Sequence, residues 1–475
     1  MNAINESIAQ IRIHTNSDFY IVGGFIRDFL LKRDYNDIDL ILSEDALTVA
    51  KEFAYNREGS FIILDEANAA ARVILKNENL VIDFSRMKGK DIVEDLMERD
   101  YTINAMALKV GQDGGVDWDN LIDPTNGKID MENKCIRMLS EKAFQDDPLR
   151  MIRGVRFAAQ LDFDIEDITA KSIKKHSKYL MTSGAERISH ELFQILKCNG
   201  THYYFNMMDK HLDLLNKIFP EIEPMKQVGQ CKYHVVDSWA HSLYTLNVAE
   251  SIIYADGYFE NHLREAYEEH TQRIFSNGHT RIQLIKLAAL FHDIGKPSAK
   301  WTDETGRIRF KGHEITGMEI VADISDRLKL SNKEKQFLCK IVKEHMWPLT
   351  LYKENDVSGR AIYDLFKNFG EDTLDVLLVS LADMIATRKL LHPHEEMGMY
   401  KVHIEYLANN YLTRFRELMD LSHVLNGNEV MEHFDIDDGK VVGQILEDVR
   451  KAIFFGKIPP EKERAIHYIE KGMFQ

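Results

Sequence analysis

The chain has 475 residues, of which 44% are apolar, and its 60 lysines and arginines stand against 76 aspartates and glutamates, for a net charge of −16. This length exceeds what one hydrophobic core can organise and predicts roughly three or four domains. The acidic excess argues against a protein that coats nucleic acid non-specifically. Any RNA contact must therefore use a local basic surface.

No apolar run approaches the ~20 residues of a membrane-spanning helix, and residues 1–16 are polar and of mixed charge, unlike a signal peptide. We therefore expect a cytoplasmic protein without a membrane contact. The cysteines are far apart and form no Cys-x-x-Cys, so we expect neither a disulfide framework nor a thiolate metal site. They are Cys135, Cys198, Cys231 and Cys339.

Residues 1 to about 130 alternate short apolar runs with helical patterns. Such alternation predicts a mixed sheet with helices, an α/β part. The strands are expected at 20–22, 38–42, 61–64, 71–75 and 80–84.

The first two of these strands enclose a glycine turn. Gly23 and Gly24 follow the first strand, a helix with Arg27 and Asp28 comes next, and Asp37 and Asp39 open the second strand. Side chains two apart on a strand share a face, so both carboxylates can hold one ion while the residue between them faces the core. Paired oxygen ligands beside a glycine turn suit Mg²⁺ bound to a nucleotide's phosphates. The pattern indicates metal-assisted nucleotidyl transfer; the alternative is two aspartates that merely flank an ordinary strand.

From Cys135 onward the pattern is almost wholly helical. One predicted helix there carries a compact basic face that is a candidate RNA contact, although such faces are usually only solvated. Its lysines are Lys171, Lys174, Lys175 and Lys178.

Further motifs follow the carboxylates in a fixed order, at residues 98–107, 123–130, 146–161 and 186–192. In order and spacing they resemble the class II tRNA nucleotidyltransferase and bacterial poly(A) polymerase family. The resemblance implies Mg²⁺ on the catalytic carboxylates Asp37 and Asp39. It also implies a nucleotide site built from Gly23, Gly24, Arg27, Asp28, Arg99, Asp100, Asn104, Asp147, Arg150, Arg153 and Arg156.

Several of these positions have predicted roles. Arg99 and Asp100 are placed at the ribose, where a carboxylate would select ribonucleotides. Asp147 and Arg150, three apart on an expected helix face, would hydrogen-bond the base edge and replace a nucleic-acid template. The alternative for this pair is an intrahelical ion pair. Asp83 is either a third metal carboxylate or an aspartate on an edge strand.

Two positions depart from the family pattern: Glu98 replaces a usual arginine, and Asp146 replaces a common glutamate. The segment between Asp83 and Asp95 is also short. A shortened segment resembles the branch of the family that adds only CC, which favours CC over complete CCA addition.

A second constellation of imidazoles and carboxylates lies between residues 231 and 390 and resembles the HD phosphohydrolase superfamily. Ligands of this kind on separate helices suit a divalent transition metal such as Mn²⁺, Fe²⁺ or Ni²⁺, which could activate water for attack on a phosphoester. The alternative is an inert helical scaffold. His241, His292, Asp293 and Asp383 match the single-metal set, and His313 and His345 match positions that extend it.

The predicted protein is thus an α/β nucleotidyltransferase head followed by mostly α-helical neck, HD and tail domains. The expected boundaries are 1–134, 135–228, 229–400 and 401–475. The expected activity is addition of C, with or without A, to the 3′ end of tRNA from CTP and ATP. The alternatives are a poly(A) polymerase and an HD phosphohydrolase with a nucleotide-binding regulatory head.

Overall fold

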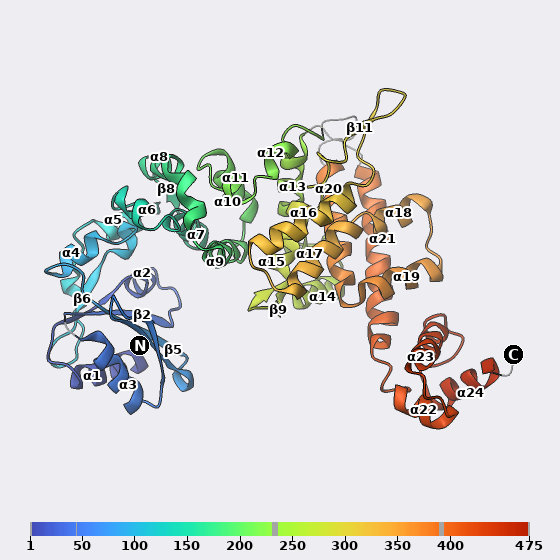
Figure 1. Cartoon of the computed structure of the whole chain (residues 1–475), viewed down its shortest axis with the longest axis horizontal. Coiled ribbons are helices and arrows are strands. Elements are labelled where there is room, and N and C mark those ends of the chain that lie inside the picture. The colour runs from blue at the N-terminus through green and yellow to red at the C-terminus, as the bar shows by residue number, and fades with distance from the viewer. Residues whose placement is uncertain (1, 44, 230–235, 389–393, 474–475) are drawn as a thin grey trace. The chain divides into compact units, whose positions relative to one another are not determined.

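The computed structural model describes residues 2–43, 45–229, 236–388 and 394–473, so Cys231 lies outside the described residues. The chain forms two compact units (Figure 1) and passes from one to the other three times, once within helix α10 (Thr201–Lys210). The first unit comprises Met1–Cys198 and Asn206–Ile218, and the second comprises Asn199–Phe205 and Phe219–Gln475. The predicted head and most of the predicted neck lie in the first, and the predicted HD and tail segments lie in the second.

A six-stranded sheet with the order β3-β4-β5-β2-β1-β6 organises the first part of unit one. All the strands expected from apolar runs are present. The sequence analysis missed the short β6 of this sheet, and it also missed β7 (Cys135–Ile136) and β8 (Asp164–Ile165), which pair with each other outside it. β2 and β5 are parallel, and the other neighbours are antiparallel. The strands are β1 (Phe19–Val22), β2 (Asp37–Leu42), β3 (Ser60–Asp65), β4 (Ala70–Leu75), β5 (Leu80–Arg86) and β6 (Ala107–Lys109).

The two faces of this sheet are covered differently. On one face, helix α3 (Ala46–Asn56) packs Phe53 against Phe84 of β5, and Val73 and Ile82 beside it are fully buried. On the other face, helix α4 (Ile92–Met97) contributes Ile92 to a cluster that covers β1 and the end of β2. The rest of that face, over β5, β4 and β3, stays partly exposed.

The remaining helices of unit one are α1 (Asn2–Ile13), α2 (Gly24–Leu30), α5 (Gly127–Glu132), α6 (Lys142–Asp146), α7 (Arg150–Leu161), α8 (Asp167–His176), α9 (Ala185–Leu196) and α11 (Leu215–Ile218). Helix α7 is fixed to the head by Tyr101, whose buried hydroxyl donates to the carbonyl of Arg150 at 2.7 Å. Gly154 permits this contact, because a Cβ there would lie only 2.1 Å from the Tyr101 oxygen. The neck helix is therefore held firmly beside the sheet.

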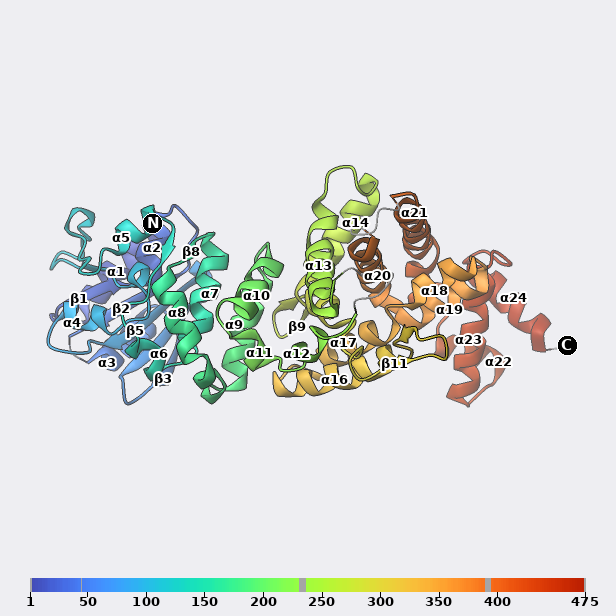
Figure 2. The same cartoon turned by 90° about the horizontal axis from the view of Figure 1, so that it is seen from above.

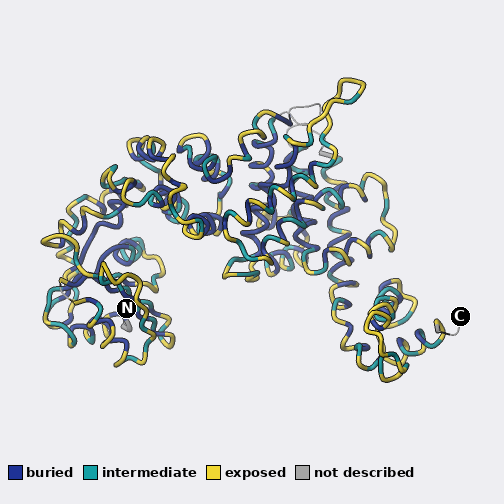
Figure 3. The backbone as a smooth tube through the Cα atoms, in the orientation of Figure 1, coloured by how far each residue is buried: buried dark blue, intermediate teal, exposed yellow. Residues whose placement is uncertain are grey.

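Unit two is mainly helical, and its core lies between packed helices (Figures 2 and 3). Its short strands form the hairpins β9 (Ile274–Ser276) with β10 (His279–Thr280) and β11 (Trp301–Thr302) with β12 (Ile308–Arg309). No helix in the described part of the chain is long and apolar enough to cross a membrane. The helices are α12 (Ile222–Met225), α13 (Ser238–Ser251), α14 (Asn261–Gln272), α15 (Arg281–Phe291), α16 (His313–Arg327), α17 (Asn332–Glu344), α18 (Trp347–Glu354), α19 (Gly359–Phe369), α20 (Thr373–Arg388), α21 (His394–Asn410), α22 (Gly427–Phe434), α23 (Gly439–Phe454) and α24 (Lys462–Met473).

Candidate active site and metal centre

The predicted carboxylate pair lies at the start of β2, where the strand emerges from the core. Ile38 is buried, whereas Asp37 is exposed and Asp39 is half-buried, as the alternation of a strand requires. Val22 of β1 lies opposite Asp39, so the glycine turn that follows β1 passes directly beside this carboxylate. Gly23 has φ +74°, and a Cβ on it would lie 2.8 Å from Oδ2 of Asp39. Glycine is therefore required here for conformation and for space.

Charges of both signs surround Asp39. Burial raises the pKa of its carboxyl, Arg99 and Arg153 oppose that rise, and the negative charges of Asp83 and Asp37 add to it. A carboxylate crowded by other carboxylates gains stability from a bound cation. The arrangement therefore fits a divalent ion held by Asp37 and Asp39.

Asp83 lies on an interior strand, so its prediction as an edge-strand aspartate was wrong. β5 stands between β4 and β2, and Asp83 lies directly opposite both Arg72 and Asp39. Arg72 donates from Nε and Nη2 to the two oxygens of Asp83, each at 2.8 Å. The sequence did not show this bidentate pair, because it depends on the order of the strands.

Five of the predicted nucleotide-site residues form one network that spans the head and the neck. Arg27 donates to both oxygens of Asp28, at 2.9 and 2.8 Å, and to Oδ1 of Asn104 at 2.8 Å. Asn104 in turn donates to Asp100, which pairs with Arg153 of α7 at 3.1 Å. The structure thus links the glycine turn to the neck helix through neighbouring side chains.

Asp100 lies beneath the surface of the site, with 6% of its area exposed. Burial alone would raise the pKa of its carboxyl, but Arg153, hydrogen bonds from Asn104 and the Tyr101 amide, and Arg150 together hold the pKa below its usual value. Both oxygens of Asp100 have partners inside the protein. Its predicted contact with the ribose stays a prediction.

Asp147 and Arg150 do not share a helix face, contrary to the prediction. Asp147 caps the C-terminal end of α6 in an extended conformation, and Arg150 begins α7. The carboxylate of Asp147 binds Arg187 of α9 at 2.7 Å, whereas Arg150 reaches the carbonyls of Glu98 and Ala143, each at 3.5 Å. Proline at the following position explains the break, because a residue before proline disfavours helical geometry.

The other predicted residues of the neck have two kinds of environment. Arg156 pairs with buried Glu191 at 3.3 Å, and burial lowers the pKa of its guanidinium. The four lysines of the predicted RNA contact are exposed along α8 and the turn after it, and Lys175 pairs with Glu141 at 2.6 Å. The basic face therefore exists, and its role in binding RNA stays a prediction.

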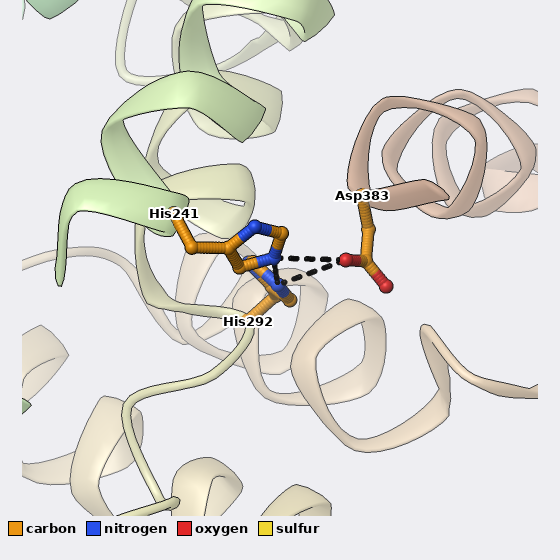
Figure 4. A group of neighbouring side chains, drawn as sticks. All are labelled: His241, His292 and Asp383. Atoms are coloured by element: carbon orange, nitrogen blue, oxygen red, sulfur yellow. Dashed lines mark hydrogen bonds and ion pairs between the residues drawn. The ribbon is translucent and has the colours of Figure 1, made fainter. Parts of the chain in front are cut away.

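The second constellation comes together in unit two from separate helices. Nε2 of His241 on α13 lies 3.2 Å from Nε2 of His292 and 2.9 Å from Oδ1 of Asp383 on α20 (Figure 4). Asp293 adds a carboxylate 3.2 Å from His292, and His313 approaches it at 3.3 Å. His345 completes a second possible ligand group with His292 and Asp293. The structure thus brings together all six predicted residues.

The backbone fixes the orientation of three of these imidazoles. Nδ1 of His292, His313 and His345 lies 2.8, 2.9 and 2.7 Å from a main-chain carbonyl, respectively. Because a carbonyl only accepts, each Nδ1 carries a proton, which leaves each Nε2 to face the cluster and to offer its lone pair once that nitrogen is unprotonated. This is the form in which histidine binds a metal, with its second nitrogen held by an outer partner.

The cluster also has the electrostatics of a cation site. Burial alone would lower the pKa of His292, but Asp293 and Asp383 raise it to about 10, which reports a strongly negative local potential. Burial lowers the pKa of His345 to about 3, so this ring stays neutral and able to ligate. Lys296 lies 2.5 Å from Asp293 and was not predicted, although it follows the His-Asp pair within one turn. The donor set fits a divalent transition metal.

The two sites define the class of protein: a nucleotidyltransferase head joined to a helical metal-binding module. The family model described as the poly A polymerase head domain matches residues 19–137, and that of the HD domain matches residues 239–388. The model described as the probable RNA and SrmB-binding site of polymerase A matches residues 162–226. The chain belongs to the tRNA nucleotidyltransferase and poly(A) polymerase family with a C-terminal HD domain.

Individual relatives agree with this membership. The CC-adding tRNA nucleotidyltransferase of Geobacter sulfurreducens is 41% identical over 189 residues, 40% of this chain and 43% of that protein. The A-adding tRNA nucleotidyltransferase of Deinococcus radiodurans is 26% identical and is covered over 94% of both chains. The Thermotoga maritima CCA-adding enzyme complexed with tRNA has the same fold, with a TM-score of 0.61, 22% identity and coverage of 99% of this chain and 95% of that one.

Proposed function

We propose that the protein is a tRNA nucleotidyltransferase that adds C, with or without A, to the 3′ end of tRNA from CTP and ATP without a nucleic-acid template. The observation that carries the proposal is the pair of carboxylates, Asp37 and Asp39, at the start of β2. Gly23 lies against Asp39, and the positive charges of Arg99 and Arg153 act on the same carboxylate. Carboxylates for a metal and guanidinium groups for phosphates are the parts that phosphoryl transfer needs. The names of the relatives support tRNA as the acceptor.

Asp37 and Asp39 would hold Mg²⁺, a hard cation that prefers carboxylate oxygens. When bound, Mg²⁺ would neutralise the triphosphate and activate the RNA hydroxyl. The chain's own residues supply the rest. Gly23 gives the phosphates close access to the backbone, and Arg99 and Arg153 provide positive charge beside them.

Two features support a finer assignment to CC addition. The segment between β5 and α4 is short, and its backbone is tied down: the amide of Lys88 donates to Asp95 at 2.8 Å and that of Lys90 donates to Glu94 at 2.9 Å. A short, tied segment resembles the CC-adding branch. The relative from Geobacter sulfurreducens carries the same activity in its name.

The HD cluster supports a second activity, hydrolysis of phosphoesters at the 3′ end of RNA by a bound divalent transition metal. Six buried or nearly buried side chains converge there, and main-chain carbonyls orient three of the four histidines so that Nε2 faces the cluster. Such an ion would supply an activated water. The choice among Mn²⁺, Fe²⁺ and Ni²⁺, and the cytoplasmic location, stay predictions.

The proposal is tested by incubating the protein with Mg²⁺, labelled CTP and tRNA that lacks its 3′ end. We expect incorporation by the wild type, none by the Asp37→Ala, Asp39→Ala double variant, and full incorporation by His292→Ala. If the double variant kept its activity on RNA and His292→Ala lost it, the HD domain would be the principal enzyme and the head its regulator.

A further inference from the structure

The catalytic face of the sheet continues beyond the carboxylates as an open strip. Cross-strand pairing places Asp39, Asp83, Arg72 and Ile62 in one row across β2, β5, β4 and β3. A second row runs through Asp37, Val81, Ile74 and Ser60. Directly opposed residues point to the same face, so both rows lie on the face of the metal site. We call the part outside β2 the platform: Ser60, Ile62, Arg72, Ile74, Val81 and Asp83.

The platform presents apolar side chains to solvent. Ile62 is 44% exposed, while Ile74 and Val81 are only half-buried. The residues that point to the opposite face, Val73 and Ile82, are fully buried under α3. An exposed apolar surface on an edge strand is a liability that proteins usually avoid. Because this exposed apolar surface is continuous with the catalytic carboxylates, it is a candidate binding surface.

The geometry of the reaction fixes the direction from which the acceptor comes. The residues of the nucleotide site, Gly23, Arg99 and Arg153, lie on the β1 side of Asp39. β5 and the platform lie on the other side of β2. In phosphoryl transfer, the attacking and leaving oxygens stand roughly in line on opposite sides of the phosphorus. With the triphosphate toward β1, the attacking hydroxyl must approach from the platform.

We propose that the platform binds the single-stranded 3′ end of the acceptor RNA and presents its terminal hydroxyl to Asp37 and Asp39. The inference rests on the proposed function and adds the position of the acceptor. Bases would pack against the apolar side chains of Ile62, Ile74 and Val81 and remove them from water, which is favourable whatever the base. Arg72 uses Nε and Nη2 for Asp83, which leaves its Nη1 for a backbone phosphate.

β3 supplies a matched pair of variants. Ile62 is 44% exposed and Ile63 is 47% exposed, but they point to opposite faces of the strand. We expect Ile62→Ser to raise the KM for tRNA roughly 5- to 10-fold, the loss of one base contact, with an unchanged KM for CTP. Ile63→Ser should leave both constants at the wild-type value. An unchanged KM for tRNA in Ile62→Ser, or equal effects of the two changes, would overturn the proposal.

A second measurement does not depend on turnover. Ile62→Cys and Ile63→Cys, each coupled to a photoreactive group, are irradiated with tRNA that lacks its 3′ end, with wild-type protein treated alike as the blank. Crosslinks from position 62 to the terminal nucleotides, and not from position 63, support the platform. Crosslinks to the double-stranded stem, or none above the blank, contradict it. If the crosslinks form but no nucleotide is incorporated, the proposed activity fails while the RNA site stands.

Sedimentation of the same variants addresses a second copy of this chain as the occupant, since an exposed edge strand can pair with its own copy. A wild-type dimer that Ile62→Ser converts to monomers would overturn the RNA platform in favour of a chain-to-chain interface. A sedimentation coefficient that does not differ among the wild type, Ile62→Ser and Ile63→Ser agrees with RNA as the occupant.

Discussion

The carboxylate of Asp39 can take its position only because residue 23 is a glycine. Gly23 has a backbone conformation that side chains rarely adopt, and there is no room for a Cβ between it and the carboxylate. The neighbouring Gly24 has no such constraint, because a Cβ there would meet Arg27 Nη2 at an ordinary 3.5 Å. Two adjacent glycines of one motif therefore have different physical roles.

We expect Gly23→Ala to lower the rate of CMP incorporation by about 100-fold, because a displaced metal ligand is costly. Gly24→Ala is the control and should keep its rate within a few-fold. Incorporation of labelled CTP measures the effect, and thermal unfolding of both variants checks the fold. Equal rates for the two variants would contradict the assigned role of Gly23.

Asp100 makes the junction between head and neck dependent on pH. Its folded-state pKa is held below the usual value near 3.9, so its contribution to stability is present above that pH and is lost as the pH falls through the folded pKa. We expect Asp100→Asn to lower the free energy of unfolding by about 1–3 kcal/mol at pH 7, because the donors that face the carboxylate lose their charged acceptor. The difference from the wild type should shrink below about pH 4. Denaturant unfolding at several pH values measures it, and a constant difference would contradict the argument.

At the scale of elements, the ends of helices decide where the side chains that are predicted to select the base lie. Asp147 stands between α6 and α7 and is held by Arg187 of α9, so three helices set its position. The sequence analysis expected Asp147 and Arg150 on one helix face, and that local structure was wrong. Arg187 could have been suspected only from its place in the motif at 186–192.

We expect Asp147→Ala to reduce the preference for CTP over UTP at least about tenfold, because a carboxylate that reads a base edge is lost. Asp146→Ala is the matched control: Asp146 is the adjacent, exposed acid and pairs only with Lys142, at 4.0 Å. Competition between labelled CTP and UTP measures the preference. An equal loss in both variants would assign Asp147 a structural role only.

The sequence predicted the elements better than their arrangement. Apolar runs located β1 to β5, but β6 was missed because its pattern covers only Ala107–Lys109. Strand order is not a local property, so the interior position of β5 and the pair of Arg72 with Asp83 could not be read from the chain. The six residues of the HD cluster were predicted from the resemblance to the HD phosphohydrolase superfamily. The carbonyls that orient them lie at the ends of helices, and only the structure shows them.

At the scale of the whole molecule, the chain carries two sets of candidate metal ligands in two separate units. The carboxylate pair belongs to the first unit, and the histidine cluster belongs to the second. The two sites favour different ions: the first offers oxygen ligands, and the second offers mainly imidazole. A substitution that removes the metal from one site should therefore leave metal binding at the other site unchanged.

We expect His292→Ala to purify with little or no transition metal, because both possible ligand groups contain His292. His270→Gln is the control, since His270 is also a buried histidine of unit two but binds Asp375 outside the cluster. Elemental analysis of the purified proteins measures the metal. Equal metal content in His292→Ala and the wild type would contradict the site.

The most direct test of the central claim is the length of the product on tRNA that lacks its 3′ end. The account predicts two added residues with CTP alone, none with ATP alone, and no product from Asp39→Asn. A third residue that appears only when ATP is also present would revise the assignment from CC to CCA. A long ladder with ATP alone would identify a poly(A) polymerase, and no extension under any condition, with Mg²⁺ present and the protein folded, would contradict the account.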